Sequence, residues 1–179
     1  MIFTTTDIDG AMLVDLDRLT DERGFFARAW CRREFAEHGL LAELAQASFA
    51  FTTGKGTLRG MHYQAAPHAE AKVVRCTRGA AHMVALDLRP DSATHGRWIA
   101  AELTSHNRRA LYVPPGCAQG YQTLMDETEI LYQMSAEYNP ASARGVRFDD
   151  PRFAIDWPLP VARISERDRN WPDYEEGRP

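Results

Sequence analysis

The sequence lacks the usual features of a disulfide-stapled, zinc-binding or membrane-spanning protein. Its three cysteines, Cys31, Cys76 and Cys117, are odd in number and show no CxxC spacing. This argues against a disulfide framework and a zinc site, and favours a reducing cytoplasm. No apolar stretch approaches the roughly 18 residues of a membrane span, and no basic segment followed by an apolar run marks a signal peptide at the start. We therefore expect a cytoplasmic protein without a membrane partner.

An excess of positive charge is missing as well, since the formal net charge is -4 at pH 7. Proteins that bind nucleic acids more often have a basic surface, so we expect no nucleic-acid partner. The 179 residues fit one domain that buries about two thirds of its unfolded surface without a staple. The sequence therefore predicts a single domain over residues 1–179.

Short strands with turn residues between them dominate the pattern after residue 56. β-type runs recur at intervals of about ten residues, which is typical of an all-β sandwich or barrel. We expect a jelly roll over roughly residues 45–140 with short peripheral helices. Helical spacing appears at residues 32–44, other helix signals begin at Thr20 and Asp21, and Ser165 is a possible N-cap near the C-terminus. The strands are predicted at residues 72–77, 81–88, 98–103, 110–113 and 129–134.

Four stretches contain residues suited to chemistry. In LRGMHYQ (residues 58–64), strand alternation puts His62 on one face and Arg59 on the other unless a bulge turns it. Lys72 stands on an otherwise apolar strand face, as an edge residue or as a cation in a pocket. Gln119 follows a rigid proline-glycine turn, and Tyr132 is strand-borne. Each has a plain structural interpretation too: a surface histidine, an edge lysine, a turn and a core tyrosine.

In this order, the four stretches resemble the dTDP-4-dehydrorhamnose 3,5-epimerase family over nearly the whole chain. DERGFF (residues 21–26) is similar to its N-terminal substrate loop and LRGMHYQ to its base-bearing strand. Residues 70–98, 111–124 and 129–140 are similar to the strands that follow, and DDPRFAIDWP (residues 149–158) and SERD (residues 165–168) are similar to its C-terminal segment. Any single motif is weak, but the ordered set is specific.

The resemblance implies a cupin-type jelly roll that forms a homodimer, in which an N-terminal segment reaches across to the partner. Many cupins hold a metal with histidines, yet Gln64 and Gln119 stand where those ligands would be. Because an amide is a poor substitute for imidazole as a transition-metal ligand, we expect no metal. The chemistry that the family performs needs no redox cofactor either.

The resemblance also implies a role for each site residue. His62 is the base that removes a proton next to a C4 ketone, and Asp168 is its carboxylate partner. Tyr132 is the acid on the opposite face of the sugar, and Lys72 stabilises the enolate oxygen. The substrate-binding residues include Arg23 and Arg59 at the diphosphate, and Phe26 and Tyr138 as candidates for stacking. They also include Arg28 and Gln119, the two positions at which the chain has a different residue from the family.

Those departures predict a changed substrate with unchanged proton transfer. Gln119 replaces a histidine expected near the phosphates, Arg28 replaces a glutamate, and residues 47–51 are more apolar than in the family. Several functions stay open: a single 3- or 5-epimerase, a ketoisomerase acting on another sugar nucleotide, a non-catalytic sugar-nucleotide binding protein, and a metal-dependent cupin enzyme.

Overall fold

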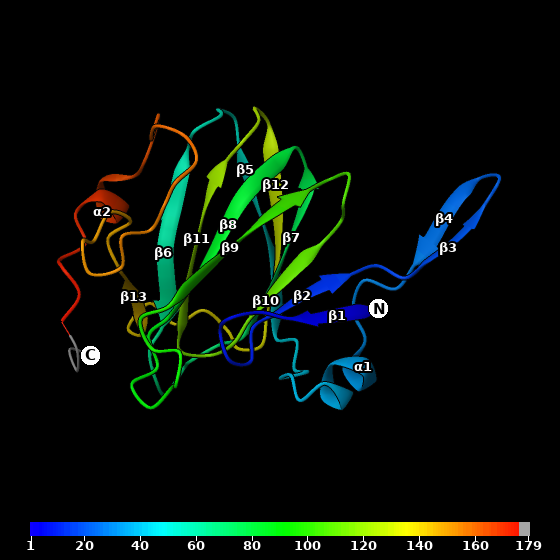
Figure 1. The fold of residues 1–179 in the computed structure, drawn as a ribbon, viewed down its shortest axis with the longest axis horizontal. Coiled ribbons are helices and arrows are strands. Elements are labelled where there is room, and N and C mark those ends of the chain that lie inside the picture. The colour runs from blue at the N-terminus through cyan, green and yellow to red at the C-terminus, as the bar shows by residue number, and fades with distance from the viewer. Residues whose placement is uncertain (176–179) are drawn as a thin grey trace.

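Two antiparallel β-sheets packed face to face form the body of the protein in the computed structural model, which describes residues 1–175 (Figure 1). The larger sheet runs in the order β1 (Ile2–Thr5), β2 (Met12–Asp15), β10 (Ala110–Val113), β7 (Lys72–Arg78), β12 (Thr128–Met134) and β5 (Gln46–Thr52). The smaller sheet runs in the order β13 (Ala143–Gly145), β6 (Leu58–Gln64), β11 (Cys117–Thr123), β8 (Ala80–Asp87) and β9 (Trp98–Thr104). The predicted all-β jelly roll is confirmed, and β1 and β2 extend its larger sheet beyond the expected limits of residues 45–140.

Strand alternation explains how the core forms. On β7, Val74 and Cys76 are buried in one core cluster with Met83 of β8 in the facing sheet and Ile130 of the neighbouring strand β12. The intervening Val73 points to the outer side of the same sheet, where Phe35 of α1 (Arg32–Glu37) covers it. Because successive side chains point to opposite faces, one strand supplies two apolar layers.

The helical pattern at residues 32–44 is realised only in its first half. The chain leaves α1 after Glu37, and Gly39 adopts a φ of 70°. The N–H groups of Gly39 and Leu40 then donate to the carbonyls of Ala36 and Phe35, which satisfies acceptors that the helix end leaves open. The periodic leucines beyond Gly39 therefore belong to an irregular connection.

The early helix signals at Thr20 and Asp21 were wrong. These residues end β3 (Arg18–Asp21), which pairs with β4 (Gly24–Ala27) as a two-stranded hairpin. The hairpin projects away from the sandwich, at the end opposite to α2 (Glu166–Arg169) (Figure 1). We call residues 18–27 the arm.

Candidate active site

A cavity with two lobes opens between the sheets, with β5 and β12 on one wall and β6 and β11 on the other. The lobes have volumes of about 480 and 500 Å³, within the range of small-molecule sites. His62, Tyr132 and Gln119 line both of them. We call the first the lysine lobe, because it contains Lys72, and the second the arginine lobe, because it contains Arg59 and Arg163 as well as Asp168.

His62 and Asp168 form a close pair at the boundary of the lobes. The imidazole Nε2 lies 2.6 Å from Asp168 Oδ1. Because a carboxylate accepts hydrogen bonds, this contact places the proton of neutral His62 on Nε2 and leaves Nδ1 as its basic atom. The His62 side chain is 42% exposed, whereas that of Asp168 is 6% exposed. The pair therefore combines an accessible base with a sheltered anion.

Asp168 is held by groups from two segments of the chain, strand β6 and the start of α2. Its backbone N–H donates to Ser165 Oγ at 3.1 Å, so Ser165 caps α2 as the sequence predicted. Its Oδ2 accepts from the Gly60 N–H at 3.2 Å. Burial alone would raise the pKa of Asp168. The hydrogen bond and charge of His62, together with the hydrogen bond from the Gly60 N–H, lower the pKa to below its usual value. Asp168 is thus anionic at neutral pH.

The strand β6, which carries His62, approaches its neighbour β11 closely at Gly60. A Cβ on Gly60 would overlap the Cα of Gly120 on β11, so this crossing requires glycine. The pairing of β6 with β11 also shifts register between Gln119 and Tyr121. Such an irregularity turns a side chain to the other face, and Arg59 indeed lines the arginine lobe beside His62.

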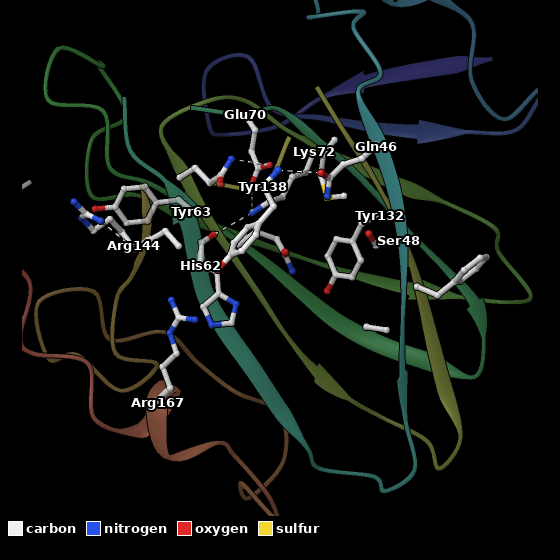
Figure 2. Close-up of a pocket in the computed structure, with 16 residues that line it drawn as sticks. Gln46, Ser48, His62, Tyr63, Glu70, Lys72, Tyr132, Tyr138, Arg144 and Arg167 are labelled. Carbon is white, nitrogen blue, oxygen red and sulfur yellow. Dashed lines mark hydrogen bonds and ion pairs between the residues drawn. The ribbon is translucent and has the colours of Figure 1, made fainter. Parts of the chain in front are cut away.

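Tyr132 projects from β12 toward the cavity, on the wall opposite to His62 (Figure 2). Burial raises the pKa of Tyr132 well above its ordinary value, and the nearby phenol of Tyr121 adds to this rise. A hydrogen bond from Gln119 offsets part of it. The phenol is therefore fully protonated at neutral pH, as an acid must be before it donates.

Lys72 lies at the inner end of the lysine lobe in a buried ion pair. Its Nζ is 3.0 Å from Glu70 Oε1, and the two side chains are 11% and 7% exposed. The same Nζ is 3.5 Å from the carbonyl oxygen of His62. Gln64 Nε2 donates to Glu70 Oε2 at 3.3 Å, so the carboxylate is held on both oxygens (Figure 2). The lysine is positioned as a fixed donor next to the base.

Gln119 lies deeper than the sequence indicated. It is 4% exposed, pairs in register with His62, and donates to Met83 Sδ at 2.8 Å. Its amide also lowers the pKa of Tyr132, so this departure reaches the acid candidate and does not lie only near the phosphates. The amide sits between the two catalytic candidates at the bottom of the cavity.

The three N-terminal candidates, two in the arm and one directly after it, lie outside this cavity within one chain. Arg23 is 84% exposed and pairs with Asp21, Phe26 is 72% exposed, and Arg28 pairs with Glu34. None of the three lines either lobe. Tyr138, by contrast, stands at the rim of the lysine lobe as an exposed ring (Figure 2).

Four charged residues that line the lobes received no role from sequence reasoning, namely Glu70, Arg144, Arg163 and Arg167. Arg167 lines both lobes, and its guanidinium lies 5.2 Å from the ring centre of Trp171. Its position directly before Asp168 was the available signal. Glu70 is the counter-ion of Lys72. It lies two residues before Lys72, just ahead of the predicted strand, and this position in the sequence gave no indication of the contact.

Residues 1–175 contain no group of three or more histidine, cysteine or acidic side chains arranged to hold a metal ion. Within the same residues, no helix is long and apolar enough to cross a membrane.

Comparison with known proteins matches this geometry to a single family. The family model described as dTDP-4-dehydrorhamnose 3,5-epimerase matches residues 5–176. The chain belongs to the dTDP-4-dehydrorhamnose 3,5-epimerase family. A family member from Methanothermobacter thermautotrophicus with that name is 38% identical over 177 residues, which cover 97% of this chain and 95% of the relative.

Other members show how the family's structure and named activity vary. The crystal structure of the dTDP-4-dehydrorhamnose 3,5-epimerase from Elizabethkingia anophelis superposes with a TM-score of 0.94 at 34% identity, covering 97% of this chain and 96% of that one. A relative from Streptomyces niveus, 37% identical over 91% of this chain and 79% of its own length, is named a dTDP-4-dehydrorhamnose 3-epimerase. The epimerase family thus includes enzymes named for one carbon and for two.

Proposed function

We propose that this protein inverts one or both carbons that flank the C4 ketone of a dTDP-4-keto-6-deoxyhexose, with His62 as base and Tyr132 as acid. The observation that carries the proposal is the placement of these two side chains on opposite walls of one cavity. Inversion requires a proton to leave one face of the sugar and to return on the other. Two groups on opposite walls meet that requirement.

Proton removal is assigned to Nδ1 of His62. The C–H bond next to the ketone breaks, its electron pair becomes an enolate, and the proton moves to the imidazole. The resulting imidazolium lies 2.6 Å from the buried Asp168 carboxylate, which stabilises its charge and keeps the ring oriented. Lys72 supplies a positive charge for the enolate oxygen.

Proton return is assigned to Tyr132. Its O–H bond breaks, a C–H bond forms on the opposite face of the carbon, and the electron pair remains on the phenolate oxygen. The raised pKa of the buried phenol keeps the proton in place until the more basic enolate carbon is present. Solvent restores both groups after the product leaves.

Binding of the diphosphate is assigned to Arg59 and Arg167, which line the arginine lobe. Planar guanidinium groups suit phosphate oxygens because they donate two parallel hydrogen bonds. Tyr138 at the rim has an exposed ring that suits stacking with the nucleobase of the substrate.

A homodimer completes the proposal. The arm exposes Leu19 and Phe26, at 70% and 72%, and it carries Arg23 away from its own cavity. Exposed apolar groups on a projecting hairpin favour insertion against another copy. We assign Arg23, Phe26 and Arg28 to the cavity of the partner subunit.

The test is incubation with dTDP-4-keto-6-deoxyglucose in deuterated water, followed by NMR of the sugar. Deuterium at both C3 and C5 identifies a double epimerase, and deuterium at one carbon identifies a single epimerase. Binding without exchange at either carbon would favour a non-catalytic binding protein instead. The relative named a 3-epimerase makes the single inversion the second candidate.

The cellular setting that we propose is a reducing cytoplasm. Cys31, Cys76 and Cys117 are all free thiols. Burial raises the pKa of Cys76 to about 11 and that of Cys117 to about 12, so both remain unreactive thiols at neutral pH.

A further inference from the structure

Gln64, the last residue of β6, has a buried amide in the lysine lobe that takes no part in the proton transfers. The side chain is 3% exposed and lines that lobe. Its Nε2 lies 3.2 Å from the carbonyl oxygen of Glu137, 3.3 Å from Glu70 Oε2 and 3.0 Å from the carbonyl oxygen of His68. Its Oε1 accepts from the Asn139 N–H at 2.6 Å. The amide thus connects β6 to two other segments of the chain.

One of these segments carries Tyr138 at the rim of the lobe. Tyr138 lies between Glu137 and Asn139, and Gln64 binds the main chain of both neighbours. A backbone N–H can only donate and a carbonyl oxygen can only accept, so these contacts also fix the orientation of the amide. The N–H of Tyr138 itself donates to Gln46 Oε1 at 2.9 Å. The backbone on both sides of the exposed ring is therefore anchored to Gln64.

The other segment leads from Gln64 to Lys72. Glu70 accepts from Gln64 through Oε2 and binds Lys72 Nζ through Oε1, at 3.3 and 3.0 Å. The side chains of Glu70 and Lys72 are 7% and 11% exposed, so little water is present to take the place of either contact. The position of the ammonium group therefore depends on Gln64 as well as on Glu70. Lys72 and Tyr138 line the same lobe (Figure 2).

We propose that Gln64 is a positioning residue for both ends of the substrate: it places Lys72 at the enolate through Glu70, and Tyr138 at the nucleobase through the main chain of residues 137–139. The proposal rests on the proposed function, from which it takes the roles of Lys72 and Tyr138. A charge that is fixed before the reaction stabilises the transition state without having to reorient. A ring that is fixed before binding loses less freedom when the nucleotide arrives. One amide thus contributes to kcat through the first contact and to affinity through the second.

Gln64→Met tests the proposal, because it keeps the length of the side chain and removes its hydrogen bonds. We expect kcat to fall about tenfold, because a displaced charge stabilises the enolate less. The Kd of dTDP, measured by calorimetry, should rise about fivefold, because the stacking ring is less ordered. Glu70→Gln removes only the charged partner of Lys72, so it should lower kcat by a similar factor and leave the Kd of dTDP unchanged. An unchanged kcat in Glu70→Gln, or a rise in its Kd equal to that in Gln64→Met, would overturn the inference.

Gln122→Met is the matched control. Gln122 on β11 is fully buried, donates to the carbonyl oxygen of Leu159 at 2.8 Å and accepts from the N–H of the same residue at 3.0 Å. It anchors a loop as Gln64 does, but it lines neither lobe. This variant is expected to lose thermal stability and to keep the wild-type kcat and Kd. Changes in kcat and Kd equal to those in Gln64→Met would contradict the proposal.

Double variants separate positioning from a general contribution to stability. If Gln64 acts on the chemistry through Lys72, adding Gln64→Met to Lys72→Gln should not lower kcat further. If it acts on binding through Tyr138, adding Gln64→Met to Tyr138→Ala should not raise the Kd of dTDP further. Additive effects in either pair, in an enzyme whose wild type turns over, would refute the role of Gln64. Absence of exchange in the wild-type protein would instead refute the proposed function, so the two failures are distinguishable.

Discussion

The catalytic cavity and the arm are built in opposite ways. In the cavity, His62, Asp168 and Tyr132 come from three distant segments, and each is held by contacts within the same chain. In the arm, Arg23 and Phe26 come from one short hairpin and are largely exposed. The comparison indicates that the proton-transfer groups are preorganised by one chain. The arm residues, by contrast, are proposed to act in the cavity of a second copy.

Loss of the base is expected to have the largest effect. His62→Ala should lower kcat/KM by about 10³-fold, because a positioned general base contributes roughly 10²- to 10⁴-fold. The measurement is the steady-state rate of epimerisation. His106→Ala, which removes an exposed imidazole elsewhere, serves as the control and should be near wild type. Equal rates in both variants would contradict the role of His62.

Asp168→Asn is expected to have the next largest effect, with kcat about 10²-fold lower and KM little changed. The amide can present its NH2 group to His62 and favour the tautomer protonated on Nδ1, which cannot act as the base. The exposed pair of Asp149 with Arg147 supplies the control variant Asp149→Asn. A fall in kcat/KM that came entirely from KM would show that Asp168 binds substrate instead.

The arm should respond differently from the cavity. Arg23→Ala is expected to raise KM about tenfold with a smaller change in kcat, because it removes a phosphate contact remote from the reacting carbon. Arg33→Ala, at an exposed arginine of α1 that pairs with Glu37, is the control.

Subunit mixing sharpens that comparison. If the arm completes the site of its partner, equal mixing of inactive His62→Ala with Arg23→Ala gives one fully functional site in each mixed dimer. About a quarter of all sites should then have wild-type KM, because half of the dimers are mixed. Activity equal to the average of the two parents would show that each arm serves its own chain or none.

The smallest expected effect is on stability at acidic pH. Because the pKa of Asp168 is lower in the folded protein than in the unfolded chain, its contribution is fully present above the unfolded value of about 3.9. This contribution is lost as the pH falls from there through the folded pKa. Urea midpoints should therefore differ between wild type and Asp168→Asn at pH 7, and the difference should narrow below about pH 4. A difference that is constant with pH would contradict the linkage.

Sequence patterns predicted most of the central strands well, including β12 in one wall of the cavity. Alternation and turn residues placed β10 at its observed limits and β7, β8, β9 and β12 to within about one residue, because these strands each bury a regular face. The ordered resemblance brought His62, Tyr132 and Lys72 together, although they are separated by as many as 70 positions along the chain. Local spacing alone contains no such information.

Other features depend on tertiary contacts that no local pattern encodes. The position of Arg59 required the register shift between β6 and β11, and the depth of Gln119 required its pairing with His62. The arm sequence has helix signals, yet its strands pair as a hairpin. Trp171 lies against Gly145, where a Cβ would overlap the indole, and this contact helps to hold the segment that carries Asp168.

The most direct test of the central claim compares His62→Asn with Tyr132→Phe under single-turnover conditions in deuterated water. If the base and the acid act from opposite walls, Tyr132→Phe should incorporate deuterium into recovered substrate of unchanged configuration. The same variant should form almost no inverted product. His62→Asn should do neither in the forward direction. Inverted product from Tyr132→Phe at the wild-type rate, or exchange retained by His62→Asn and lost by Tyr132→Phe, would contradict the assignment of base and acid.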